Sequence, residues 1–557
     1  MKENIDKMRF KFLCSSLVFN IIINSVCGWQ VLTKMIPMRD GVKLHTKIVI
    51  PTFSFRGHST ILTRSPYGYD DLEKYGKFYS LFNFVSIGQD WRGTGLSEGV
   101  FSNFLTEDND GFDTIDWITK QSWFNGKIYT LGASADGLSS FLLLNGIEKN
   151  NDKYLKNISG QFFLLTTNIF YPTFYNGGAY HYGLIDKWIN DTLRDNDKDT
   201  SRLFLQKQEK NITFWNSMEN KDIYKKITWP TIFYAGWYDI FTLGNILTFD
   251  KIESSTFIII DPCGHCQDAS KYFNANLIYG RTALSIFVSL YQFNIISRLR
   301  RNIKKVTFYV MKPPFCDPWI YGNYFTTLNS WPTFIEKSFY LQNNYMLSED
   351  NNEIGIYSFI SNPNNPVPTL GGSNYELSPC GPVDQTPLNN RNNTEMLIFR
   401  SNKLSEDLVI TGPLIAECHV SSNVSDFDLS VRLSVYNPKN NIASLINDGM
   451  VRMRNRDPND DSLQLVEDGK IYSVNVSLWN TSFVLPQGFQ IQLAICGSNY
   501  PKFSVNTQTG NNLMDELYNN ITSKVGKINV HNSTRVILPY IENYRKNLPY
   551  FDMCKFI

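Results

Sequence analysis

The feature that most constrains this chain is a serine in a turn of small residues, LGASADG at 131–137. The turn follows a run that favours a strand, 127–130, and precedes a run that favours a helix, 138–144. A serine between a strand and a helix is typical of a nucleophile elbow, where small neighbours permit a sharp, strained turn. The match to G-x-S-x-G is imperfect, because Asp136 occupies the place of the second glycine and Gly137 comes one residue late. Similar serine turns occur in ordinary loops, so the remaining residues must supply a catalytic setting.

Such a serine needs a histidine to accept its proton and a carboxylate to orient that histidine. In hydrolases with an elbow, the order along the chain is serine, acid, histidine. Of the six histidines, only His265 directly follows a strand of the predicted sheet beyond the serine. Asp239 follows the preceding predicted strand, whereas the rival Asp261 lies four residues before His265, on the same predicted loop. We therefore predict a catalytic triad of Ser134, Asp239 and His265.

The predicted base also lies within a motif that could serve another function, Cys263-Gly264-His265-Cys266. The pattern C-G-H-C is found in disulfide isomerases, and two cysteines with a histidine can begin a zinc site. The tryptophan that usually precedes the redox motif is missing, and the sequence shows neither a compact thioredoxin-like unit nor a further pair of metal ligands. We favour two thiols that flank the base and can form a local disulfide.

A glycine-rich segment follows another predicted strand, with Gly93, Gly95 and Gly99 in the spacing G-x-G-x-x-x-G. This differs from the spacing of dinucleotide-binding loops, and no acidic residue follows a second strand at a suitable distance. We expect a tight loop, with Asp90 and Arg92 available to pair inside it.

The chain changes character along its 557 residues. Strands alternate with helices up to about residue 145, and again from 231, which predicts an α/β sheet with crossover connections. Residues 145–225 favour helices, and a long helix is predicted over 283–299. After about residue 312, short alternating runs separated by turns predict a β-sandwich or jelly roll. The predicted organisation is a signal peptide (1–28), an α/β domain in two parts (29–160 and 226–312), an inserted helical cap (161–225) and a β-sandwich (313–557).

The N-terminal thirty residues indicate export. Basic residues precede an apolar run at 12–23, which is typical of a secretory signal, although an anchor or a buried helix would have a similar composition. Nine asparagines begin N-x-S/T sequons, which agrees with secretion and glycosylation. They are Asn157, Asn190, Asn211, Asn392, Asn423, Asn475, Asn480, Asn520 and Asn532.

The composition argues against two classes of partner. The net charge is +1, and positive and negative residues are interspersed. The chain therefore has no strong electrostatic field that would attract nucleic acid or a membrane surface. After the predicted signal, no stretch is apolar enough over eighteen or more residues to span a membrane. We expect a small-molecule ester or peptide substrate, and no metal or organic cofactor.

Many ordered motifs resemble the cocaine esterase and X-prolyl dipeptidyl-peptidase family of serine hydrolases, along almost the whole predicted mature chain. The matching segments are PMRDGVKL (37–44), RSPY (64–67), QDWRG (89–93), DGFDTIDW (110–117), QSWFNGK (121–127), GWYD (236–239), PVPTLGG (366–372), DGMVRMR (448–454) and GSNYPKF (497–503). The family's elbow is G-x-S-Y-x-G, so Gly132, Ser134 and Gly137 fit its spacing. The late glycine is thus the family's variant of the motif.

The resemblance implies an α/β-hydrolase domain with an inserted helical cap and a C-terminal jelly roll. It assigns the nucleophile to Ser134, the acid to Asp239 and the base to His265. It further implies that the Tyr67 hydroxyl and the Ala135 N–H bind the oxyanion. Residues at positions similar to the esterase's acyl pocket are Phe241 and Trp188.

Two positions depart from the family pattern. Ala135 replaces the tyrosine that follows the nucleophile, which preserves the backbone N–H but alters the packing around it. Before His265, the family's tryptophan is also replaced, so the shape of that loop is open.

The sequence leaves the substrate open among related alternatives. We expect a secreted serine esterase that forms an acyl-enzyme, with an X-Pro dipeptidyl-peptidase as the alternative. Asp136 and Asp186 are candidate anchors for a substrate amine. A more remote alternative is a non-catalytic secreted protein whose jelly roll binds a partner or carbohydrate.

Overall fold

A computed structural model of the chain describes residues 28–52, 57–69, 72–219, 221–253, 256–265, 272–273, 304–314, 316–351, 355–375 and 379–552. The signal segment 1–27 and the helix predicted over 283–299 lie outside these residues. The chain divides into two compact units. The N-terminal unit extends to Phe162 and includes Thr192–Arg194, and the C-terminal unit comprises Phe163–Asp191 and the chain from Asp195.

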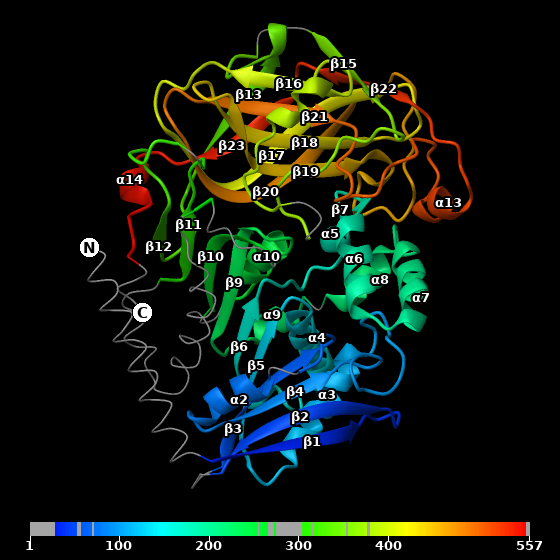
Figure 1. Cartoon of the computed structure of the whole chain (residues 1–557), viewed down its shortest axis with the longest axis vertical. Helices are drawn as coiled ribbons and strands as arrows, with labels where there is room; N and C mark the ends of the chain where they lie inside the picture. The colour runs from blue at the N-terminus through cyan, green and yellow to red at the C-terminus, as the bar shows by residue number, and fades with distance from the viewer. Residues whose placement is uncertain are drawn as a thin grey trace. The chain divides into compact units, whose positions relative to one another are not determined.

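The N-terminal unit is built on a mixed sheet with strand order β1-β2-β4-β3-β5-β6 (Figure 1). Its elements are β1 (Trp29–Pro37), β2 (Lys43–Pro51), β3 (His58–Ser65), α2 (Leu72–Ser80), β4 (Phe84–Asp90), α3 (Glu107–Thr119), β5 (Phe124–Ala133), α4 (Ala135–Lys149) and β6 (Ile158–Leu164), the last of which ends at the unit boundary. β1 and β2 form the predicted antiparallel hairpin, whereas β3 runs parallel to β4 and β5. Parallel strands end at one edge of a sheet, and the loops after β3 and β5 therefore emerge there together.

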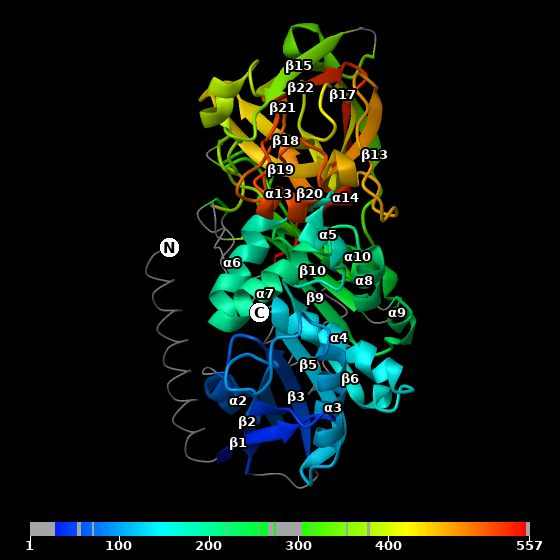
Figure 2. The ribbon, with the colours of Figure 1, turned by 90° about the vertical axis from the view of Figure 1, so that its right-hand side faces the viewer.

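The C-terminal unit begins with helices and short strands in the segment predicted as a cap. They are α5 (Tyr171–Phe174), β7 (Tyr175–Asn176), β8 (Ala179–Tyr180), α6 (Tyr182–Thr192), α7 (Asp195–Gln206), α8 (Ile212–Met218) and α9 (Ile223–Lys226). α6 and α7 lie side by side in both views (Figures 1 and 2). An ion pair joins them, with 2.7 Å between Arg202 Nε and Asp186 Oδ1. Among the described helices, none has the length and hydropathy needed to span a bilayer.

An α/β segment follows, with β9 (Thr231–Tyr238), α10 (Thr242–Lys251), β10 (Thr256–Gly264), β11 (Val306–Val310) and β12 (Tyr324–Leu328). β9, β10 and β11 are parallel, as the alternating pattern predicted, and β12 adds an antiparallel strand. β12 lies beyond residue 312, in the segment that the sequence assigned to the β-sandwich. The exact domain boundaries stay a prediction.

The remaining strands form an eleven-stranded, mostly antiparallel sheet. It accounts for the alternating runs of the sequence. They are β13 (Ile335–Gln342), β14 (Met346–Ser348), β15 (Ile356–Ser361), β16 (Met396–Ser401), β17 (Leu408–Ser422), β18 (Asp428–Asn437), β19 (Ile442–Arg452), β20 (Tyr472–Leu485), β21 (Gln490–Cys496), β22 (Gly526–His531) and β23 (Arg535–Tyr540), with α13 (Leu513–Tyr518) and α14 (Tyr544–Asn547) between or after them. The two predicted runs at 408–411 and 415–420 belong to one long strand, β17, with an irregularity between Pro413 and Ile415.

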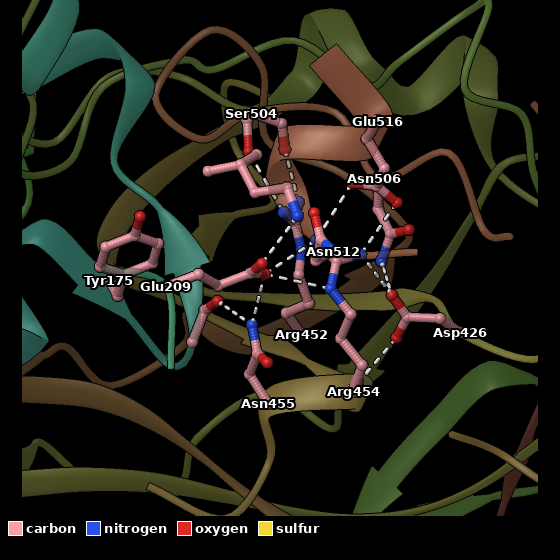
Figure 3. Close-up of polar contacts among 12 residues, drawn as sticks. Tyr175, Glu209, Asp426, Arg452, Arg454, Asn455, Ser504, Asn506, Asn512 and Glu516 are labelled. Atoms are coloured by element: carbon pink, nitrogen blue, oxygen red, sulfur yellow. Dashed lines mark hydrogen bonds and ion pairs between the residues drawn. The ribbon is translucent and has the colours of Figure 1, made fainter. Parts of the chain in front are cut away.

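A buried charge cluster joins the cap segment to the β-sandwich (Figure 3). Arg454 Nη2 lies 2.8 Å from Glu209 Oε1 of the cap, and its Nη1 lies 2.8 Å from Asp426 Oδ2 and 2.9 Å from Glu516 Oε1. Beside it, Arg452 makes a bidentate pair with Asp428, with both N–O distances at 2.8 Å. Because each charge has hydrogen-bonded partners, the cluster can be buried without an isolated ion.

Candidate active site

Ser134 lies in the strained turn that the sequence predicted. It follows β5 and precedes α4, with φ 55° and ψ −124°, a backbone conformation that non-glycine residues rarely adopt. Gly132 is required at this turn, because a Cβ there would lie 2.3 Å from the backbone carbon of Asp136. The turn therefore has the local geometry of a nucleophile elbow.

The start of α4 provides backbone donors next to this serine. The first N–H groups of a helix have no carbonyl partner within it, and the helix dipole favours negative charge there. Ala135 is the first residue of α4, and its side chain is buried. This position suits the predicted oxyanion donor, whose role stays a prediction.

Tyr67, the other predicted oxyanion donor, lies in the same unit, just after β3. Its side chain is 49% exposed, and its N–H donates to Ser65 Oγ at 3.1 Å. Helix α4 is tied to this strand end, because the Ser139 hydroxyl donates to the Arg64 carbonyl at 3.0 Å. The Tyr67 loop and the elbow are thus held at the same edge of the sheet.

Asp136, two residues after the serine, is a half-buried acid rather than an exposed anchor. Burial raises the pKa of its carboxyl to about 7, although a hydrogen bond from Ser65 lowers that pKa in part. Its Oδ1 is out of contact with solvent and has no hydrogen-bond partner among the described residues. Burial, and then the negative charge of Asp136, also raise the pKa of Tyr69. The sequence predicted neither Ser65 nor Tyr69 as part of this site.

In the C-terminal unit, the predicted acid and base form a buried pair. His265 Nδ1 lies 2.6 Å from Asp239 Oδ2, and the two side chains are 4% and 0% exposed. Asp239 follows β9, and His265 follows β10, the adjacent parallel strand. The other Asp239 oxygen accepts the Phe241 N–H at 2.8 Å. A carboxylate fixed in this way places a proton on Nδ1 and leaves Nε2 as the proton acceptor.

The rival acid, Asp261, has different partners. Its carboxylate accepts a hydrogen bond from the Tyr234 hydroxyl, and its Oδ1 accepts the Cys263 N–H at 2.8 Å. These bonds hold the strand end just before His265. The contacts therefore support Asp239 as the orienting acid, as predicted from strand order.

Cys263, the cysteine of C-G-H-C that the structure describes, lies in a setting unlike that of a redox thiol. Cys263 is a free, buried thiol, and burial followed by the charge of Asp261 raises its pKa well above the ordinary value. A thiol of raised pKa is a poor nucleophile. No group of three or more potential ligands for a metal occurs among the described residues. Cys266 lies outside them, so the local disulfide stays a prediction.

The two predicted pocket residues are both buried in the C-terminal unit. The Phe241 ring meets the His265 ring edge to face, with 5.1 Å between their centroids. Trp188 lies on α6 and is 7% exposed. Contact with the base supports Phe241 as a residue that shapes the site, and the role of Trp188 stays a prediction.

The glycine-rich loop after β4 is a structural loop, as expected. The Leu96 N–H donates to Asp90 Oδ2 at 2.9 Å, inside the loop. Arg92 instead pairs outside the loop, with Asp110 at 2.7 Å and Asp40 at 2.6 Å. Gly95 has φ 48°, and a Cβ there would meet the Asp90 carboxylate.

Two family models match this chain. X-Pro dipeptidyl-peptidase (S15 family) matches residues 40–193, and the X-Pro dipeptidyl-peptidase C-terminal non-catalytic domain matches residues 317–532. A curated relative, cocaine esterase from Rhodococcus sp. (strain MB1 Bresler), is 24% identical over an alignment that covers 91% of this chain and 98% of the relative.

Solved structures resemble the chain over most of its length. An α-amino acid ester hydrolase labelled with selenomethionine gives a TM-score of 0.75 at 19% identity, over 92% of this chain and 97% of its own. An aminopeptidase from the marine sediment archaeon Thaumarchaeota archaeon gives a TM-score of 0.74 at 19% identity, with the same coverage. These matches confirm the predicted fold class, an α/β-hydrolase fold with a C-terminal β-sandwich.

Proposed function

We propose that this chain is a secreted esterase among the serine hydrolases related to X-Pro dipeptidyl-peptidases and cocaine esterase, with a Ser134-Asp239-His265 triad. The observation that carries the proposal is the buried pair of Asp239 and His265, 2.6 Å apart at the ends of adjacent parallel strands. The strained conformation of Ser134 supports it from the other unit.

In the proposed reaction, His265 Nε2 takes the proton of Ser134 Oγ as that oxygen attacks the ester carbonyl. The Ala135 N–H and the Tyr67 hydroxyl donate to the oxyanion that forms. The intermediate collapses to an acyl-enzyme, and His265 returns the proton to the departing alcohol. Water then attacks the acyl group, again with His265 as base. This step releases the carboxylic acid and regenerates the Ser134 hydroxyl.

A fluorophosphonate probe tests the nucleophile directly. We expect wild-type protein to be labelled and Ser134→Ala to be unlabelled. Ser122→Ala, a change of an exposed serine in the N-terminal unit, serves as the control and should label like wild type. Equal labelling of Ser134→Ala would exclude Ser134, and unlabelled wild type would support a non-catalytic protein.

The choice of ester over peptide substrates is supported by the state of the two candidate amine anchors. Asp186 is neutralised by Arg202, at 2.7 Å, and accepts a hydrogen bond from the Tyr180 hydroxyl at 3.0 Å. Asp136 has a pKa raised to about 7 by burial. Neither is a freely available carboxylate, which a dipeptidyl-peptidase would use to hold a substrate amine.

A comparison of p-nitrophenyl esters with an X-Pro p-nitroanilide tests this choice. We expect higher kcat/KM for the esters. Preferential cleavage of the anilide would instead establish the X-Pro dipeptidyl-peptidase alternative.

Export is supported by the N-terminal signal pattern and by the exposure of the sequons. Each of the nine sequon asparagines is at least partly exposed in the structure. Expression in a eukaryotic secretory host should yield protein that lacks residues 1 to about 28 and loses mass on glycosidase treatment. An intact N-terminus on cytosolic protein would refute export.

A further inference from the structure

An apolar groove of about 460 Å³ runs beside α10 in the C-terminal unit. Its apolar lining includes Leu243, Leu247, Trp331, Phe334 and Ile415. Leu247 and Phe334 are each 39% exposed, so large apolar groups face solvent there. Contiguous exposed apolar surface usually marks a site that another group covers.

Two of the nine sequon asparagines, Asn475 and Asn480, line this same groove. Strand β20 alternates in burial, so Asn475 and Ser477 are exposed while Val474 and Val476 are buried. On the paired strand β17, Ile415 lies opposite Ser477. Sugars attached at the two asparagines would therefore begin at the wall of the groove.

The aromatic side of the groove is held in a fixed position. The Trp331 Nε1–H donates to Asp250 Oδ1 at 2.8 Å, and its ring stacks on Phe308 with centroids 6.0 Å apart. A rigid aromatic face loses little conformational entropy when another group packs on it. The axial C–H faces of a hexose ring are apolar, whereas its hydroxyls can stay in water.

We propose that N-linked glycans on Asn475 and Asn480 cover this groove, with their first N-acetylglucosamine residues packed against Trp331 and Phe334. The inference rests on the proposed export. In the attachment step, the asparagine Nδ2 displaces the pyrophosphate of a lipid-linked oligosaccharide donor. A C–N bond forms, the C–O bond to the donor breaks, and the nitrogen releases one proton.

The experiment uses the full chain, secreted once with its own N-terminal segment and once with a heterologous leader. Glycopeptide mass spectrometry should find sugars on both asparagines. The folded protein is then treated either with an endoglycosidase that leaves one N-acetylglucosamine or with an amidase that removes the whole glycan. A fluorescent anionic dye for apolar surface reports whether the groove is open.

We expect the trimmed protein to retain its low dye signal and the fully deglycosylated protein to bind about twofold more dye. The amidase converts asparagine to aspartate, and the added charge would weaken binding of an anionic dye, so an increase must come from exposed apolar surface. Thr522→Ala, which removes the Asn520 sequon outside the groove, should leave the response unchanged. The double variant Asn475→Gln and Asn480→Gln should show high dye binding without treatment.

Unoccupied Asn475 and Asn480 in protein secreted by the heterologous leader would overturn the inference. So would an unchanged dye signal after complete deglycosylation, or a secreted dimer that buries the groove against a second copy. If only the protein with its own N-terminal segment fails to be secreted, the proposal of export fails while the groove inference is supported by the other protein.

Discussion

Replacement of Asp136 by asparagine should stabilise the N-terminal unit at neutral and alkaline pH. The folded carboxyl has a pKa of about 7 against an ordinary value of 3.8, because burial disfavours its charged form. Between these two values the folded state keeps a proton that the unfolded state has released. Stability therefore falls as pH rises from about 4 to 7, and is not recovered above that range. Asparagine has the same shape and does not titrate.

The size of the effect follows from the shift. The folded and unfolded pKa values of Asp136 differ by about 3 units, and each unit corresponds to about 1.36 kcal/mol. Above pH 7, ionisation of this carboxyl therefore lowers the stability of the folded wild-type protein by up to about 4 kcal/mol. The Ser65 hydroxyl can still donate to the amide oxygen of Asp136→Asn, so that contact is retained. At pH 8 the free energy of unfolding of the variant should therefore exceed that of wild type by up to about 4 kcal/mol. At pH 4 the two free energies should be almost equal.

Hydrogen exchange measured against urea concentration can report the N-terminal unit separately. Peptides from α4 and β3 are followed at pH 5 and pH 8, with each rate normalised to the intrinsic exchange rate at that pH. Asp152→Asn, at a partly exposed turn of the same unit, controls for the change in net charge. If Asp136→Asn and wild type differ in stability by the same amount at both pH values, burial does not raise the pKa of Asp136 as argued above.

Further predictions concern the catalytic groups and the charge cluster. Asp239→Asn should lower kcat by about 10⁴-fold with little change in KM, because the histidine would lose its oriented tautomer. Asp261→Asn should have a much smaller effect, and the reverse order in ester assays would exchange the two roles. Tyr67→Phe should lower kcat by about 10²- to 10³-fold if the hydroxyl binds the oxyanion, and unchanged kcat would remove it from that role. Arg454→Ala should destabilise the C-terminal unit by about 3–5 kcal/mol in denaturant melts, because it leaves buried carboxylates unpaired. A loss below about 1 kcal/mol would show that the cluster is not a net source of stability.

The elbow could be predicted from sequence because its determinants are adjacent. The strand, the small residues and the helix all lie within 124–149, and the structure has β5, a strained Ser134 and α4 there. Asp239 was preferred to Asp261 because it follows a separate strand, and the structure pairs Asp239 with His265. In both cases, local pattern and strand order were sufficient to predict the geometry, and the catalytic roles stay a prediction.

The charge cluster could not be predicted, because its members come from distant parts of the chain. Glu209 and Glu516 are separated by hundreds of residues, and both bind Arg454. The segment DGMVRMR was recognised as a family motif, but charged side chains at alternate positions usually indicate a solvent-exposed face of a strand. Only tertiary structure shows that Arg452 and Arg454 are buried. The apolar groove was missed for the same reason, since its lining joins α10 to β17 and β20.

The same cluster has a consequence for how such enzymes can be recombined. A chimaera that takes its cap from one relative and its β-sandwich from another must also inherit a matching set of charges. Without Arg454, the buried Glu209 would lose its ion-pair partner, although its Oε2 would still accept the Leu513 N–H at 2.7 Å. The domain described by its family model as non-catalytic therefore limits which caps, and through them which substrate pockets, this chain can acquire by exchange of segments.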